Sequence, residues 1–267
     1  EQPIIPSEPC DKLETQLFLL PHDQRKGEGG LRTKGYFKHT QPDKPLITMI
    51  TVVFNGEAHL EETILSVLNQ TYDNVEYIII DGASTDGTLD IVNKYEHAID
   101  YWVSEPDDGI YDAMNKGICL AFGDIIGLVN ADDVLYLRTV DMVSKSFAEN
   151  MKAAFSLGSV DLALDDGSIY GNARALNQSE IEKRLYREMP CPHQAVYVHR
   201  RVYLDLGGFR EKYRLSADYD FLLRAFASGW EPVCLPASVG FFRMGGQSGG
   251  LATYQETRRV LQNHGCS

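Results

Sequence analysis

The chain has 267 residues, 43% hydrophobic and 24% charged, which is the composition of a soluble globular protein long enough to bury a sizeable core. Its 25 Lys and Arg against 38 Asp and Glu leave a net charge of −13, which argues against nucleic acid as a partner. No stretch approaches the ~18 apolar residues of a membrane span, and the first residues show no secretory signal. The five cysteines lack CxxC spacing, so they indicate neither a zinc site nor a disulfide framework. We therefore expect a cytoplasmic protein.

Residues 1–45 carry prolines, a glycine-rich stretch and little periodicity, which predicts an irregular N-terminal extension. Between residues 22 and 44, six Lys and Arg against three Asp and Glu leave a local charge of +3. Such a segment is either a solvated arm or a contact with an acceptor or with the membrane surface, which leaves open a peripheral location at the inner face of the membrane.

From residue 46, short apolar runs alternate with segments of helical spacing. The predicted strands are 46–54, 75–81, 100–103 and 124–130, and the predicted helices between them are 58–69, 86–95 and 110–121. This alternation indicates a mostly parallel sheet with helices on both faces, whose ligands bind beyond the carboxyl ends of the strands. Functional residues are therefore expected just after positions 54, 81 and 130.

The second half of the chain is less regular. It predicts helices over 134–149, 217–228 and 251–263, strands near 153–157 and 194–199, and a surface hairpin over 158–173.

The segment DGASTDGT (81–88) directly follows an apolar strand. It is either a capped strand-to-helix turn, with Ser84 or Thr85 as the cap and Asp86 in the first turn, or a nucleotide-binding loop in which Asp81 accepts hydrogen bonds from a base or ribose. The GxGxxG fingerprint is absent, which argues against a dehydrogenase.

The segment NADD (130–133) places Asp132 and Asp133 side by side at the end of a strand. Their mutual repulsion is relieved by a divalent cation, and few hard oxygen ligands suit Mg²⁺ or Mn²⁺. The structural alternative is an acidic turn that caps a helix beginning at Val134.

In ADYDFLLRA (217–225), Asp218 and Asp220 open a predicted helix. Acids at a helix start are favoured by the helix dipole alone. A carboxylate at this position is also suited to take a proton from a hydroxyl nucleophile.

Three weaker candidates remain. Asp112 and Lys116, at i and i+4, form either a surface ion pair or a site in which Lys116 or Asn115 faces the phosphates or sugar of a donor. His193 precedes an apolar strand, and the glycine-rich stretch 241–250 carries Arg243 and Ser248.

Taken in order, these segments resemble the family-2 glycosyltransferases, inverting enzymes of the GT-A fold. The resemblance covers residues 46–228 and runs through TVVFN, SVLNQTYDNVEYIIIDGASTDGT, YDAMNKGI, GDIIGLVNADD, CPHQAVYV, and GGF followed by ADYDFLLR. YDAMNKGI and CPHQ are most similar to bacterial members that build colanic-acid-like surface polysaccharides.

The resemblance implies roles for individual residues. Phe54 matches the family's aromatic near the nucleotide base, and Asp81 matches the first acid of its DDGS-type loop. Asp132 and Asp133 match the acids that contact metal, diphosphate and ribose, and Asp218 matches the catalytic base. With Asp112, Lys116 and His193, these residues are the candidate nucleotide-sugar site.

The sequence departs from the family at three positions. Gly82 stands where many members have an Asp that contacts the base, Asn130 replaces the first Asp of the metal motif, and Ala217 replaces a Glu before Asp218. Recognition of uracil and the choice between Asp218 and Asp220 therefore stay open.

The resemblance predicts a GT-A domain over residues 46–267, with a nucleotide-binding half over about 46–133 and an acceptor half over about 134–267. We expect metal-dependent hexosyl transfer from a nucleotide diphosphate sugar, a UDP-sugar by the resemblance, to a saccharide hydroxyl, free or lipid-linked, with inversion in one in-line displacement. A non-catalytic sugar-nucleotide or saccharide-binding protein is the alternative; a sugar nucleotidyltransferase is disfavoured by the acidic FNGEAHLEE after the first strand.

Overall fold

The structure of the protein is a computed structural model that describes residues 13–243 and 250–265. Ser248 and the first twelve residues of the N-terminal extension lie outside this part of the chain.

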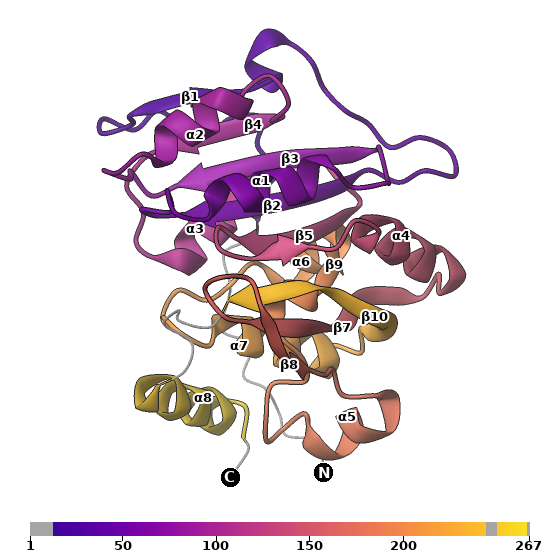
Figure 1. Cartoon of the computed structure of the whole chain (residues 1–267). Coiled ribbons are helices and arrows are strands. Elements are labelled where there is room, and N and C mark those ends of the chain that lie inside the picture. The colour runs from indigo at the N-terminus through magenta and orange to yellow at the C-terminus, as the bar shows by residue number, and fades with distance from the viewer. Residues whose placement is uncertain (1–12, 244–249, 266–267) are drawn as a thin grey trace.

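The first half of the domain is a parallel sheet with the strand order β4-β3-β2-β5 (Figure 1). Its strands are β2 (Ile47–Val53), β3 (Val75–Asp81), β4 (Tyr101–Ser104) and β5 (Ile125–Asn130), and its helices are α1 (Leu60–Leu68), α2 (Thr88–Tyr95) and α3 (Ile110–Leu120). Each lies within two residues of its predicted bounds. The predicted parallel βαβ arrangement is therefore confirmed.

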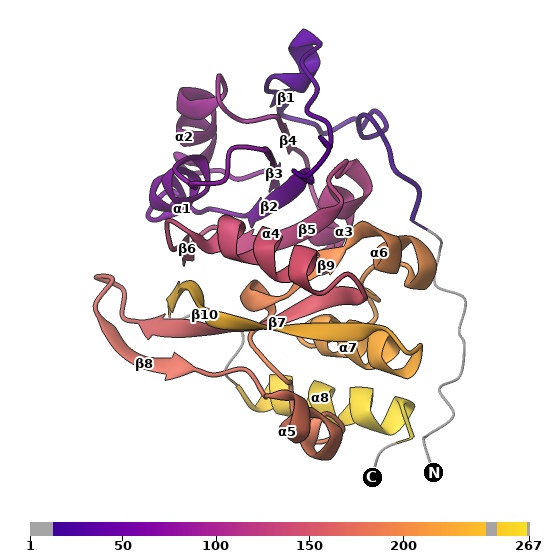
Figure 2. The same ribbon diagram turned by 90° about the vertical axis from the view of Figure 1, so that its right-hand side faces the viewer.

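Helices cover both faces of this sheet (Figure 2). In β3, Tyr77 and Ile79 pack with α1 and α2, whereas Ile78 and Ile80 pack with α3 on the opposite face. Successive strand residues point to opposite faces, so a strand buried on both sides must be apolar at most of its positions. This explains why every residue of VEYIII except Glu76 is apolar.

The second half extends the same sheet through strands of mixed direction. β9 (Tyr197–His199) pairs antiparallel with β5 and with β7 (Ala153–Ala163), and β7 pairs in parallel with β10 (Glu231–Arg243). The helices of this half are α4 (Thr139–Glu149), α5 (Gln178–Arg184), α6 (Arg200–Leu206), α7 (Ala217–Ala227) and α8 (Leu251–Asn263). β7 and β8 (Ile169–Ala173) form the predicted surface hairpin.

In this half one prediction needs correction, and one strand was not predicted. The helix expected from 134 begins at 139, because β6 (Val134–Leu135) pairs with β10 instead. β10 itself was not predicted, since its sequence EPVCLPASVGFFR alternates poorly and is held by an irregular register with β7.

Residues 25–44 of the N-terminal segment pack against the domain and do not form a solvated arm. β1 (Gly27–Gly29) pairs with β4 at the sheet edge, and Arg32, in the short 3-10 helix η1 (Arg32–Lys34), is 2% exposed. Its guanidinium lies 2.7 Å from Glu76 and donates to the carbonyl of Leu120 at 3.0 Å. The other cations of the segment also bind the protein itself: Arg25 contacts Glu105, Lys26 two carbonyls, Lys34 Glu96, Lys38 Asp100 and Lys44 Asp73.

This buried pair gives a stability prediction. Replacing Arg32 with Met removes a charge whose partner, Glu76, stays buried, so we expect a loss of about 3 kcal/mol in the free energy of unfolding. The matched control is Lys34→Met in the same short helix, whose ion pair with Glu96 is 3.4 Å long and solvent-exposed, and which should cost less than about 1 kcal/mol. Urea denaturation followed by tryptophan fluorescence measures both, and equal losses would contradict the structural role of Arg32.

Candidate functional site

A cavity of about 830 Å³ lies beyond the carboxyl ends of β2, β4 and β5, where the strand rule places ligands. Four predicted site residues line it: Phe54, Asp132, His193 and Asp218. The cavity also receives side chains from the second half, including Arg214 and Thr257. Residues about 200 positions apart in the sequence thus meet at one site.

The loops after β2 and β3 are braced against each other. Asn55, in the left-handed region with φ 52°, accepts a hydrogen bond from the backbone N–H of Thr85 at 2.8 Å, and its own N–H donates to the Ser84 hydroxyl at 2.7 Å. This bracing holds Phe54, whose side chain is 65% exposed on the cavity wall.

Asp81 does not line the cavity. It is 1% exposed and accepts hydrogen bonds from the Ser84 backbone at 3.0 Å and from the hydroxyls of Ser84 and Ser104. The predicted caps Ser84 and Thr85 do not cap α2, because its N-cap residue is Gly87; Asp86 precedes the helix and accepts from the Thr88 backbone at 3.1 Å. In the DGAST segment, the Asp81 carboxylate is therefore fully hydrogen-bonded within the protein and stabilises the turn.

The two adjacent acids at the end of β5 have different environments. Asp132 lines the cavity, whereas Asp133 is 2% exposed and does not. One Asp133 oxygen accepts from the Arg243 backbone at 3.3 Å, and the other has no hydrogen-bond partner among the described residues. Burial and the charge of Asp132 raise the pKa of Asp133 well above its usual value. This placement does not support Asp133 as a ligand to a metal in the cavity.

The acids of α7 are separated in the same way. Asp220 is fully buried and paired with Arg224, Arg210 and His264, whereas Asp218 lines the cavity. A hydroxyl from α3 reaches Asp218, since Tyr111 donates to Oδ1 at 3.0 Å.

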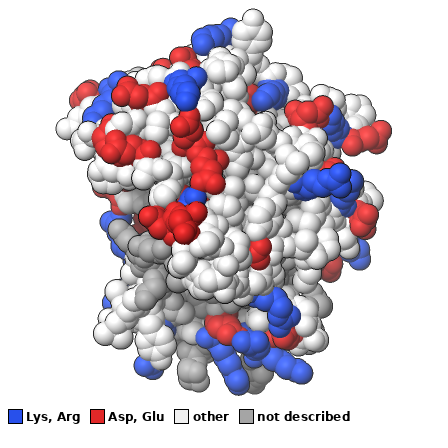
Figure 3. Space-filling view, viewed as in Figure 1, with Lys and Arg blue, Asp and Glu red and all other residues white. Residues whose placement is uncertain are grey.

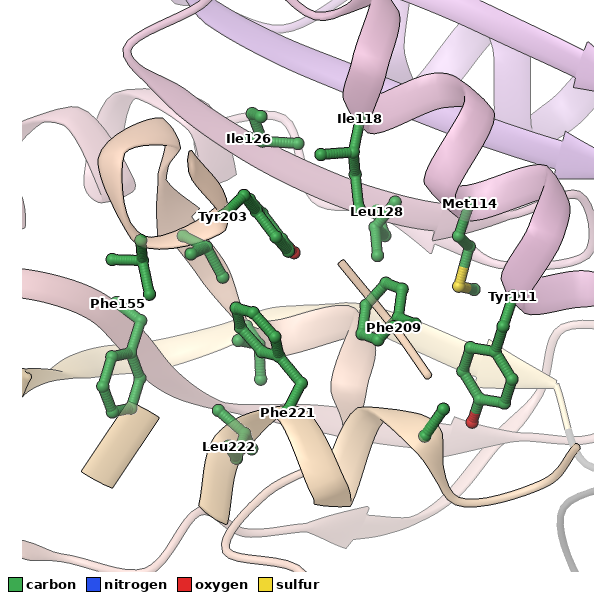
Figure 4. Close-up of a cluster of buried hydrophobic side chains, with 14 of the residues drawn as sticks. Tyr111, Met114, Ile118, Ile126, Leu128, Phe155, Tyr203, Phe209, Phe221 and Leu222 are labelled. Carbon is green, nitrogen blue, oxygen red and sulfur yellow. The ribbon is translucent and has the colours of Figure 1, made fainter. Parts of the chain in front are cut away.

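The positions of α3 and α7 are fixed by one aromatic cluster (Figure 4). Phe209 contacts Tyr111 with ring centroids 5.3 Å apart and Phe221 at 5.6 Å, and Tyr203 stacks on Phe221 at 4.7 Å. Burial, followed by the negative charge of Asp218, raises the pKa of Tyr111, so its hydroxyl stays protonated and available to donate.

His193 lies between the end of β5 and the start of α7. Its Nε2 is 3.3 Å from the amide of Asn130, and its Nδ1 is 3.6 Å from Asp218. Burial lowers the pKa of His193, although the negative charges of Asp218 and Asp132 raise it in part. The imidazole is therefore neutral at neutral pH. Of the other weak candidates, Arg243 is 6% exposed and donates to the Asp132 carbonyl at 2.7 Å, which braces the loop.

Asp112 and Lys116 lie outside the cavity lining and form the ion pair of the structural interpretation, at 3.1 Å. Sequence reasoning missed Asp107 and Tyr111, which do line it. The signal was available: β4 ends at Ser104, so the rule applied after 54, 81 and 130 also marks the segment EPDDG (105–109).

Acidic side chains dominate the left part of the face shown in Figure 3, on the side toward which β3 ends in Figure 1. Within residues 13–243 and 250–265, no group of three or more His, Cys, Asp or Glu could hold a metal by itself. In that part of the chain, no helix combines the length and the apolar character that crossing a bilayer requires.

The fold is of the GT-A type. It matches TarS of S. aureus, solved in complex with UDP (TM-score 0.64, 18% identity, 82% of this chain and 65% of that one). It also matches the mannosyltransferase PcManGT of Pyrobaculum calidifontis with GDP-Man and Mn²⁺ (TM-score 0.60, 19% identity, 88% and 68%). The chain thus spans about two thirds of these solved chains. Residues 48–207 match the family described as Glycosyl transferase family 2, and the chain belongs to that family.

Curated relatives agree with the family. A PGL/p-HBAD biosynthesis glycosyltransferase of Mycobacterium bovis is 31% identical over 190 residues, or 69% of this chain and 71% of that protein. The chondroitin synthase of Pasteurella multocida is 29% identical over 182 residues, or 67% of this chain and 19% of the synthase.

Proposed function

We propose that this protein is an inverting glycosyltransferase that moves a sugar from a nucleoside diphosphate donor, a UDP-sugar, to a saccharide hydroxyl. The observation that carries the proposal is that Asp132 and Asp218, 86 positions apart, line one cavity, with His193 between the end of β5 and the start of α7. A cavity of about 830 Å³ also suits a ligand of nucleotide-sugar size. The solved neighbours carry UDP or GDP-Man, which supports this class of donor.

The metal-ligating atoms that the protein offers in the cavity suit Mn²⁺ or Mg²⁺. Asp132 supplies a carboxylate in the cavity, and a cation that takes most of its ligands from water and phosphate needs few from the protein. We assign Asp132 as the residue that would hold it. When bound, the cation neutralises the charge that develops on the departing diphosphate.

Phe54 offers an exposed ring on which a nucleobase can stack. Asp218 accepts the proton of the attacking hydroxyl, and Tyr111 orients its carboxylate through Oδ1, leaving Oδ2 for the acceptor. Attack on the face opposite the leaving group inverts the anomeric carbon, so an α-linked donor gives a β-linked product.

Residues 46–133 are proposed as the nucleotide-binding half and residues 134–267 as the acceptor half. The motif resemblance supports a role in bacterial surface polysaccharide synthesis with a free or lipid-linked acceptor. The cytoplasmic location and a membrane contact through the basic segment stay predictions, and the ion pairs of that segment disfavour the contact.

The test is calorimetric titration of UDP-, GDP- and dTDP-sugars with and without Mn²⁺. We expect Mn²⁺-dependent binding that Asp132→Asn weakens by about tenfold or more, because the amide carries no charge. The control is Asp141→Asn, an exposed acid paired with Lys145 on α4. If a folded wild-type protein binds none of these nucleotides, or binds them equally well after the Asp132 change, the proposal fails.

A further inference from the structure

Three loops that follow neighbouring strands meet at one wall of the cavity. Phe54, after β2, and Asp107, after β4, line the cavity, and Gly82, after β3, lies behind them in contact with both. A Cβ atom placed on Gly82 would lie 3.5 Å from the Phe54 ring and would collide with the Asp107 carboxylate. The carboxylate therefore fills the space that a side chain at position 82 would take, beside an exposed aromatic ring.

Only one oxygen of the Asp107 carboxylate accepts a hydrogen bond from the described part of the protein. Its Oδ1 accepts a hydrogen bond from the Gly109 backbone at 2.9 Å, whereas Oδ2 has no donor within the described part of the chain. Partial burial of the carboxylate raises the pKa of Asp107, although the hydrogen bond from Gly109 and the charge of Lys116 act in the opposite direction. An acceptor in this position gains most from an N–H group on a planar ligand stacked against Phe54.

We propose that Asp107 reads the edge of the nucleobase and selects bases that present a ring N–H. The inference rests on the proposed nucleotide-sugar function and adds to it the determinant of base specificity. Uracil and thymine offer N3–H, and guanine offers N1–H with its amino group. Cytosine and adenine present a bare ring nitrogen at the equivalent position, so a carboxylate aligned with the ring nitrogen faces a lone pair and can pair only by shifting to the exocyclic amino group beside it.

The experiment titrates wild-type protein with UDP, dTDP, GDP, CDP and ADP in the presence of Mn²⁺. At least one nucleotide with a ring N–H should bind tenfold or more tightly than CDP and ADP, and the comparison among UDP, dTDP and GDP identifies which base fits. Asp107→Asn keeps the Oδ1 acceptor for Gly109 but adds a donor amide. It should lose about tenfold for the preferred base and gain affinity for CDP.

Two further variants separate base reading from general damage. Phe54→Ala should weaken all five nucleotides by a similar factor, because stacking does not depend on the base edge. The double variant Gly82→Asp with Asp107→Gly returns a carboxylate to the same space from the neighbouring loop. It should restore the wild-type selectivity, whereas Gly82→Asp alone should weaken binding through the collision.

The possible results separate the proposed function from the role of Asp107 in base selection. Failure of the wild type to bind any nucleotide overturns the proposed function. Binding of all five nucleotides with equal affinity, or an unchanged selectivity ratio in a folded Asp107→Asn variant, leaves that function standing and overturns the assignment of Asp107.

Discussion

Replacing Asp218 with asparagine should lower the rate of sugar transfer by a factor of about 10²–10⁴, the usual contribution of a positioned general base. Asparagine preserves the shape of the side chain and an oxygen that accepts from Tyr111, but it cannot take the proton of the acceptor hydroxyl. The donor contacts are untouched, so the dissociation constant for the nucleotide sugar should change by less than about twofold.

The rate is measured as release of UDP from UDP-sugars in the presence of Mn²⁺ and a panel of nitrophenyl glycosides as acceptors. Proton NMR of the product gives the anomeric configuration, which should be β for an α-linked donor. The matched control is Asp205→Asn, an exposed acid 3.2 Å from the indole nitrogen of Trp230. Wild-type rates in the Asp218 variant would show that another group takes the proton.

Replacing Asp220 with asparagine should instead destabilise the protein by about 5 kcal/mol, the upper end for breaking a buried ion pair. Asp220 Oδ2 accepts from Arg224 at 2.9 Å, and Oδ1 lies 2.9 Å from His264 and 3.3 Å from Arg210. Arg224 is itself 5% exposed, so the change leaves a buried guanidinium without its counter-charge. We therefore expect the Asp218 change to lower the rate of transfer and the Asp220 change to lower stability, although the two acids lie in one helical turn.

The same change should alter the dependence of stability on pH. Burial alone would raise the pKa of Asp220, but the hydrogen bond from His264 and the charges of Arg224 and Arg210 lower it below its usual value. A lowered pKa in the folded state means that the stabilisation is present above the ordinary aspartate pKa and is lost as the pH falls through the folded-state value.

Urea unfolding at pH 7 and at several pH values below 4 measures this. The difference in unfolding free energy between wild type and Asp220→Asn should be largest near neutrality and should narrow in acid. Asp141→Asn provides the reference for an exposed pair, with an expected change below about 1 kcal/mol. A gap that stays constant down to pH 2 would contradict the ionised state of Asp220.

The first half of the fold could be predicted closely from the sequence because its elements are specified locally. β3 begins and ends at the predicted residues, since a strand buried on both faces is apolar at most of its positions, here all but Glu76 and Asp81. α8 also matches its predicted bounds, 251–263. The predicted site residues at strand ends, Phe54 and Asp132, follow from the topology of a parallel sheet, which any βαβ series imposes.

Only the tertiary structure determined which of two neighbouring acids lines the cavity and which is buried in an ion pair. Asp218 and Asp220 lie two residues apart on a helix, about 200° around its axis, so they face opposite directions. Which of these directions meets the cavity depends on where Phe209, Tyr203 and Arg224 pack, and those contacts come from other parts of the chain.

The same physical limit applies elsewhere in the molecule. β10 is a strand because β7 offers it hydrogen bonds, and Arg32 is buried because Glu76, 44 positions away, requires a counter-charge. Asp107 meets Gly82 only because two strand ends come to the same edge. Local patterns in a sequence determine which residues can form an element, whereas long-range packing determines which face of that element is buried and which faces the ligand.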